Sequence, residues 1–351
     1  RPLWEVHRLE GLKDRQFAIY TKLHHATFDG VAGIRITEGG CSPDPDARAE
    51  PSPLSIDAHE RFKAARGYGR IADLEPSESD LQKIVEFCKA QFDISVHTLG
   101  LIRNYAATWL GVGDGLAVPW RHVPHTMINT KVSGARRFVA QSWSMGRIRA
   151  VSRAADVTIN DVVLAMCAGA LRRYLEEHDE LPKHSLRALV PVSVRRENDF
   201  DSPVAISYIV ADLGTRQEDP IDRLETIIES TRAGKAMLSE LSPREASLYA
   251  TLIQTPLFVA SMMGVADWFP PVSTVISNVP GPRQPLYLNG AALQGVYPLS
   301  AVFHGFALNI TFVSYHDNLD FDIVACRQTV PHVQRLIDYL EQSLAELEAA
   351  V

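Results

Sequence analysis

Apolar and polar residues along the chain follow two different periods. Short apolar or alternating runs predict strands, while apolar residues three and four positions apart predict helices between them. Strands that alternate with helices in this way favour an α/β layered architecture. Strands are predicted at residues 17–23, 137–143, 188–194, 205–213, 272–278, 307–315 and 319–324, with helical spacing at 162–174 and 333–347 and weaker helical patterns at about 77–110.

Local signals mark where some of these elements begin or end. Thr158 and Asp161 stand three residues apart ahead of an apolar run, which is the signature of a capping box at a helix start. Residues 39–55 are rich in Pro, Asp and Ser and predict a loop. At 351 residues the chain is too long for one ordinary core, so we expect two domains or two halves of one pseudo-symmetric unit.

Composition narrows the class of protein. Hydrophobic residues make up 46% of the chain and charged residues 22%, as in soluble globular proteins. The net charge is −7 and the Lys and Arg residues are scattered, which disfavours nucleic-acid binding. No cysteine stands in a C-x-x-C pair or at metal-ligand spacing from a histidine, so we predict no disulfide framework, no metal site and a reducing compartment. The cysteines are Cys41, Cys88, Cys167 and Cys326, of which Cys167 lies on the apolar face of a predicted helix.

One uncharged stretch, residues 246–266, is about as long as a bilayer is thick. It also contains polar residues and a proline, among them Ser247, Gln254 and Pro256. We therefore predict a buried helix, with a membrane-surface element as the second interpretation and a transmembrane helix as the third.

The segment His24-His25-Ala26-Thr27-Phe28-Asp29-Gly30 is the strongest chemical signal. Neighbouring residues at a strand end point in opposite directions, so only one of the two histidines can face a given cleft. A histidine there is suited to take a proton from a hydroxyl group, because its pKa lies near the working pH. Asp29 could order the local backbone, pair with an arginine or cap a helix, and Gly30 indicates a close approach that a Cβ would hinder. The alternative is a pair of polar histidines at a surface, since a metal site would lack a third ligand at helpful spacing.

Four segments taken together resemble one protein family. They are Arg1-Pro2-Leu3-Trp4-Glu5, the His24–Gly30 segment, Asn160-Asp161, and Ile276-Ser277-Asn278-Val279-Pro280-Gly281-Pro282. The pattern H-H-x-x-x-D-G is the signature of the CoA-dependent acyltransferase superfamily, which includes chloramphenicol acetyltransferase and the condensation domains of peptide synthetases. Within it, the order and rough spacing of the four segments resemble the wax ester synthase/diacylglycerol acyltransferase family over essentially the whole chain.

The resemblance implies a two-domain α/β sandwich like that of chloramphenicol acetyltransferase. Each half would be a mixed sheet with helices, and the active-site tunnel would lie between the halves. The family's second histidine is the general base, which implies that role for His25. His24 then resembles a structural or secondary residue, and Asp29 resembles the residue that holds the loop in shape.

The same resemblance suggests domain boundaries. We expect residues 1–115 to form the later part of the first domain, which carries the histidine motif, together with the start of the connection between the domains. Residues 116–135 are then a linker, and residues 136–351 form the second domain. Family members carry a further segment ahead of this point. One good strand before the histidines is too little to bury both faces of a sheet, so we expect that segment to be present as a separate chain.

The other motif residues have weaker chemical interpretations. Asn160 and Asp161 are interpreted as a helix start rather than a catalytic pair, and the Pro2–Trp4 segment as a packing element beside the histidine strand. The Asn278 amide could close the following Pro-Gly-Pro turn or donate to a developing oxyanion, and we favour the structural role; His304 could line the cleft. The residues interpreted as structural or tunnel-shaping are Pro2, Leu3, Trp4, Gly30, Asn160, Asp161 and Asn278.

The implied reaction is O-acyl transfer. A fatty acyl group would pass from acyl-CoA to a long-chain alcohol, giving a wax ester, or to diacylglycerol, giving triacylglycerol. No metal or other cofactor is implied, because acyl-CoA is a substrate. Such apolar substrates suit a cytoplasmic protein associated peripherally with the inner membrane or lipid droplets. Two alternatives stay open: a condensation-type or polyketide-associated acyltransferase with a carrier-protein-bound donor, and a non-catalytic lipid- or CoA-binding protein.

Overall fold

The computed structural model describes residues 4–24, 30–48, 55–57, 116–193 and 206–351. The chain divides into two compact units. Unit 1 comprises Arg1–Ala72, Val279–Val296 and Ser314–His316, and unit 2 comprises Asp73–Asn278, Tyr297–Val313 and Asp317–Val351. Unit 1 is therefore assembled from segments that lie far apart in the sequence.

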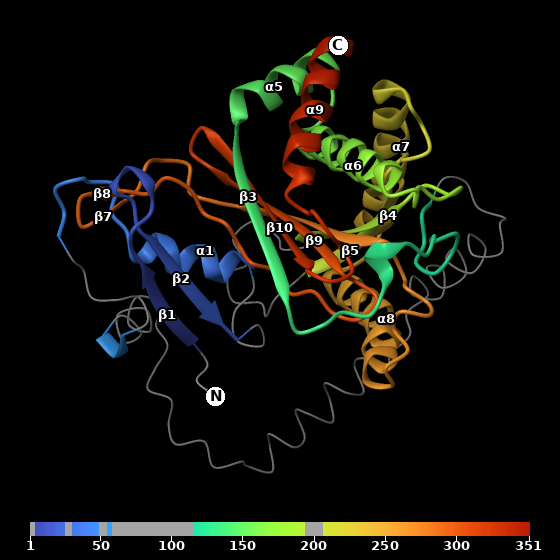
Figure 1. Ribbon diagram of the computed structural model, residues 1–351, viewed down its shortest axis with the longest axis horizontal. Helices are drawn as coiled ribbons and strands as arrows, with labels where there is room; N and C mark the ends of the chain where they lie inside the picture. Colours follow the sequence, from blue (N-terminus) through green and yellow to red (C-terminus); the bar gives the residue numbers. More distant parts are fainter. Residues whose placement is uncertain (1–3, 25–29, 49–54, 58–115, 194–205) are drawn as a thin grey trace. The chain divides into compact units, whose positions relative to one another are not determined.

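Unit 2 is built on a six-stranded mixed sheet (Figure 1). β3 pairs antiparallel with β10, and β5 with β4, whereas β4 and β6 are parallel. All six strands begin and end within two residues of predicted ones. In order across the sheet they are β3 (Arg136–Ser144), β10 (Asn318–Cys326), β9 (Leu308–Tyr315), β6 (Thr274–Pro280), β4 (Arg187–Ser193) and β5 (Ile206–Asp212).

Helices and sheet share one hydrophobic core in unit 2. Along β10, alternate side chains point to the same face, which brings Leu319, Phe321 and Ile323 into that core. The ring of Phe321 lies 5.0 Å from Trp143 of β3 and 5.4 Å from Phe312 of β9, measured between ring centroids. The helices packed together in this unit are α5 (Met145–Ala154), α6 (Ile159–Glu177), α7 (Pro220–Ser239) and α9 (Arg335–Ala350).

α6 begins where the sequence predicts. The Thr158 hydroxyl accepts a hydrogen bond from the backbone N–H of Asp161, and the Asp161 carboxylate accepts one from the backbone N–H of Thr158, so the predicted capping box is present. Asp161 is 5% exposed, and its second carboxylate oxygen accepts a hydrogen bond from the Thr231 hydroxyl of α7 at 3.1 Å. This acid therefore ties the start of α6 to α7.

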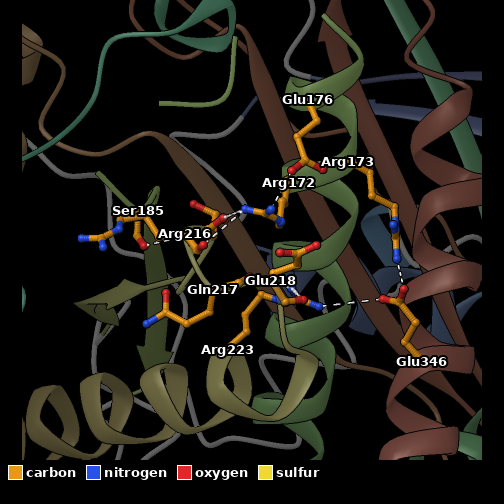
Figure 2. Close-up of polar contacts among 10 residues, drawn as sticks. Arg172, Arg173, Glu176, Ser185, Arg216, Gln217, Glu218, Arg223 and Glu346 are labelled. Carbon is orange, nitrogen blue, oxygen red and sulfur yellow. Dashed lines mark hydrogen bonds and ion pairs between the residues drawn. The ribbon is translucent and has the colours of Figure 1, made fainter. Parts of the chain in front are cut away.

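A cluster of charged side chains joins α6, α7 and α9 (Figure 2). Arg223 of α7 is 2% exposed and donates to two backbone oxygen atoms of the loop that precedes α7. Glu346 of α9 forms ion pairs with Arg173 of α6 and, at 3.9 Å, with Arg223. Burial, followed by the positive charges of Arg172 and Arg173, lowers the pKa of Arg223 to about 10. Glu346 thus supplies negative charge to a site where three guanidinium groups meet.

α8 (Pro243–Met262) contains most of the uncharged stretch and packs against β5. Ala246, Tyr249 and Ile253 of α8 are buried, as predicted for this stretch, whereas Val259 nearer the end of the helix is 46% exposed. Among the described helices, none is by itself long and apolar enough to cross a membrane, although α5 and α6 meet that test together across a bend of 103°.

In unit 1 the described residues form two small antiparallel sheets and a helix, with a short 3-10 turn (Lys13–Arg15) between the first two strands. An isolated bridge joins Ser42, in the predicted loop, to Tyr287. The strand pairs are β1 (Trp4–Leu9) with β2 (Ala18–Leu23) and β7 (Tyr287–Leu288) with β8 (Ala291–Ala292), and the helix is α1 (Gly30–Gly39).

The domain boundaries at 115 and 136 stay a prediction, because residue 115 and the helical patterns at 77–110 lie outside the described residues. Residues 116–135, predicted as a linker, contribute Val118, Ile128 and Asn129 to the buried side chains. The Asn129 amide donates to the backbone oxygen atoms of Ser273 and Gly305 at 2.9 and 3.2 Å. The described part of this segment, including the 3-10 turn at Met127–Asn129, is thus packed into unit 2.

Candidate active site

The histidine motif lies at the junction of a strand and a helix. β2 ends directly before His24, which is exposed, and α1 begins at Gly30. The predicted strand before the histidine pair is confirmed, and the chain continues after the motif as a helix. His25 and Asp29 themselves lie outside the described residues, so their roles and that of His24 stay predictions.

Trp4 lies beside the histidine strand. In the register of the β1–β2 pair it stands opposite Leu23, the residue before His24, as expected for a packing element at this place. Its side chain is nonetheless 47% exposed. Pro2 and Leu3, the other residues of that segment, lie outside the described residues.

Gly30 makes a close approach within unit 1. A Cβ at this position would lie 3.2 Å from Cγ2 of Val279, tight enough that the valine would have to shift. Val279 belongs to the Ile276–Pro282 segment, whose turn is held by two hydrogen bonds. The backbone N–H of Gly281 donates to the Ser314 hydroxyl at 3.3 Å, and the backbone oxygen of Pro282 accepts from His316 at 2.9 Å. Two of the motif segments recognised in the sequence are therefore in contact here.

Asn278 and Asn160 form a pair of amides within unit 2. The Nδ2 group of Asn278, at the end of β6, donates to Oδ1 of Asn160 at 2.6 Å. Asn160 stands in the first turn of α6, next to the capping acid Asp161. The contact joins a strand end to a helix start, and it uses one of the two N–H bonds that the Asn278 amide offers.

His304 has a partner that the sequence does not reveal. The backbone N–H of Val132 donates to its Nδ1 at 3.1 Å. Nδ1 therefore carries no proton in this arrangement, and the remaining ring proton stands on Nε2.

Within the ranges that the structure describes, no group of three or more His, Cys, Asp or Glu side chains is placed to hold a metal ion. Cys167 is fully buried in the core of unit 2, as predicted. Burial raises the pKa of its thiol far above the usual range, which keeps it protonated and a poor nucleophile.

Known proteins match this chain from end to end. The wax ester synthase/diacylglycerol acyltransferase catalytic domain matches residues 1–163, and the C-terminal domain of the same family matches residues 205–348. A putative diacylglycerol O-acyltransferase of Mycobacterium tuberculosis is 43% identical over 363 residues, which cover 100% of this chain and 75% of the relative. The chain belongs to the wax ester synthase/diacylglycerol acyltransferase family.

Other members of the family agree. The O-acyltransferase WSD of Acinetobacter baylyi is 36% identical over 351 residues, covering 100% of this chain and 74% of the relative. The solved wax ester synthase/diacylglycerol acyltransferase of Marinobacter aquaeolei VT8 matches with a TM-score of 0.73 and 38% identity, over 100% of this chain and 72% of that one. This chain is an O-acyltransferase, and the predicted family and enzyme class are confirmed.

The fold extends beyond the family. The epimerization domain from the third module of tyrocidine synthetase B matches with a TM-score of 0.52 at 14% identity, over 100% of this chain and 72% of that one. At that identity the likeness concerns the fold alone. It confirms the predicted two-domain α/β class.

The burial of two polar residues of this acyltransferase cannot be predicted from its sequence. Asn129 bonds to residues more than a hundred positions away, so no local pattern reports it. Asp322 in β10 is fully buried, and burial raises the pKa of its carboxyl group to about 9. Asp320 and Asp322 alternate with apolar residues, a pattern that normally indicates a solvent-facing side of a strand.

Proposed function

We propose that the chain moves a fatty acyl group from acyl-CoA to the hydroxyl group of a long-chain alcohol or of diacylglycerol, with His25 as the general base. One observation carries the proposal. The complete His24–Gly30 motif stands between β2 and α1 in a chain that matches acyltransferases over its full length. The substrate classes follow from the names of the relatives, which refer to wax ester synthesis and to diacylglycerol acylation.

In the proposed reaction the hydroxyl oxygen of the acceptor attacks the thioester carbonyl carbon while the imidazole of His25 takes the hydroxyl proton. The tetrahedral oxyanion collapses, the C–S bond breaks, and the protonated imidazole returns its proton to the departing CoA thiolate. A positioned general base contributes about 10²- to 10⁴-fold to the rate, and alignment of the two substrates can contribute more. The step needs no covalent enzyme intermediate, metal ion or further cofactor.

The neighbouring residues have supporting roles in this proposal. His24 points away from the reacting hydroxyl, and Asp29 holds the loop between strand and helix. Asn278 is structural, which its hydrogen bond to Asn160 supports, because the amide orients the start of α6. Because substrates and products are apolar, we infer that the enzyme works in the cytoplasm at the surface of the inner membrane or of lipid droplets.

The test is product formation by the purified chain. Palmitoyl-CoA is supplied with either hexadecanol or dioleoylglycerol, released CoA is measured, and the lipid products are identified by mass spectrometry. We expect palmityl palmitate or a triacylglycerol to appear in step with CoA, and the ratio of the two rates gives the acceptor preference. A chain that forms ester only from a carrier-protein-bound acyl donor, and none from acyl-CoA, would contradict the proposal.

A further inference from the structure

A group of exposed apolar side chains follows the end of α8 in unit 2. Met263, Trp268 and Phe269 are 71%, 64% and 75% exposed. Single exposed apolar residues are ordinary on a protein surface, but three large ones within one short segment indicate a binding surface. We call these three residues the apolar tip.

The segment that carries the tip is held along one side by residues 120–125. The backbone N–H of Trp120 donates to the backbone oxygen of Pro271 at 2.9 Å, and Nε2 of His125 lies 3.0 Å from the backbone oxygen of Asp267. The two stretches therefore run beside each other in opposite directions, tied at both ends. The aromatic side chains project from a backbone that is fixed between these ties.

A second contact fixes the start of the same segment. Gly305 adopts φ +86°, and a Cβ there would lie 2.6 Å from the backbone oxygen of Ala266, so only glycine fits this approach. Ala266 itself is 1% exposed, and the neighbouring Asp267 has a carboxylate oxygen buried in the protein. The buried residues thus face inward, which leaves the outer surface of the segment to Trp268 and Phe269.

Basic side chains border the apolar tip. Arg121 and His122 stand between the two ties, opposite the aromatic residues. The His122 ring stacks on that of His184 with centroids 5.3 Å apart, which brings the exposed Lys183 to the same border. Burial, followed by the positive charges of Arg121 and Arg187, lowers the pKa of His122. Arg121 and Lys183 therefore place two basic side chains beside the tip, on a chain whose net charge is −7.

We propose that the apolar tip and its basic border dock unit 2 onto a phospholipid bilayer. Trp268 and Phe269 enter the boundary between headgroups and acyl chains, where aromatic side chains are favoured, while Arg121 and Lys183 stand at the level of the phosphate groups. This inference rests on the proposed function, because an enzyme with apolar substrates must reach a lipid surface to bind them. It assigns the contact with that surface to residues of unit 2.

The test is co-sedimentation of the full chain with vesicles of phosphatidylcholine, alone or with added phosphatidylglycerol. The double variant Trp268→Ser/Phe269→Ser is expected to bind both vesicles about tenfold more weakly, since each aromatic loses its buried apolar area. Arg121→Gln/Lys183→Gln is expected to lose only the gain that phosphatidylglycerol gives. The matched control is Ile56→Ser, which removes a side chain that is 76% exposed in unit 1 and should leave binding unchanged.

Acyl transfer to substrates in detergent micelles, and thermal unfolding, are measured on every variant. We expect both to be unchanged in the double variant. Vesicle binding equal to that of the unaltered chain, loss of micellar activity in the double variant, or binding to a triacylglycerol emulsion but to no vesicle would each overturn the proposal. An unaltered chain that binds vesicles through the tip but forms no ester would contradict the proposed function alone.

Discussion

At the scale of single residues, buried polar groups in unit 2 differ in whether they have partners. Asp161 and Asn129 each form at least two hydrogen bonds with neighbouring groups. Asp322 does not: in the described structure neither of its carboxylate oxygens has a hydrogen-bond partner. An unpartnered buried carboxyl group is much less costly when it is neutral, which is why burial raises its pKa to about 9.

Replacement of Asp322 by Asn should make the free energy of unfolding less dependent on pH. In the unfolded chain this carboxyl group loses its proton above about pH 4, whereas the folded protein keeps it until about pH 9. The folded state is therefore progressively destabilised as pH rises across that range, by on the order of a few kcal/mol. Asn removes this loss, so the variant should gain stability over the unaltered chain as pH rises from about 5 to about 8.

Chemical unfolding at several pH values measures this difference. Asp179→Asn, at an exposed position, is the control and should follow the unaltered chain. A constant offset between the Asp322→Asn variant and the unaltered chain at every pH would show that Asp322 is ionised in the folded protein.

At the scale of elements, the start of a helix can be predicted from sequence where a capping residue marks it. The capping box at Thr158 and Asp161 places α6 correctly. α7, which the apolar pattern does not predict, carries a similar signal, because Asp219 caps the helix and Pro220 is its first residue. The burial of Arg223 has no such signal, because its carboxylate partner Glu346 lies on a helix far along the chain.

Glu346 should matter more to stability than its neighbour Glu348. The Glu346→Gln variant leaves the buried Arg223 and its neighbour Arg173 without their shared negative charge, which we expect to cost about 1–3 kcal/mol. Glu348→Gln is the matched control on the same helix. Its partner Arg147 is 37% exposed, against 3% for Arg223, and keeps a second carboxylate in Glu341, so this change should cost about 1 kcal/mol or less.

Thermal unfolding of the two variants provides the comparison. We expect the Tm to fall by several degrees for Glu346→Gln and to change little for Glu348→Gln. Equal shifts in the two variants would mean that the cluster in Figure 2 is no stronger than an ordinary surface ion pair.

At the scale of the whole molecule, sequence patterns identify the family and most strands but not how the chain is divided. Val279–Val296 belongs to unit 1 because its strands and turn join residues such as Ser42 and Ser314. These contacts connect distant parts of the sequence, so a pattern read along the chain suggests continuous domains instead. The contact between Gly30 and Val279 is of the same kind: both motif segments are visible in the sequence, but their meeting is not.

Catalysis by His25 is tested most directly by comparing CoA release from palmitoyl-CoA and hexadecanol in three proteins: the unaltered chain, His25→Ala and His24→Ala. Loss of the general base should lower the rate of His25→Ala by about 10²- to 10⁴-fold with unchanged thermal unfolding, while His24→Ala keeps clearly more activity. Equal loss in both variants with unchanged unfolding, or near-normal activity in His25→Ala, would contradict the assignment of His25 as the base.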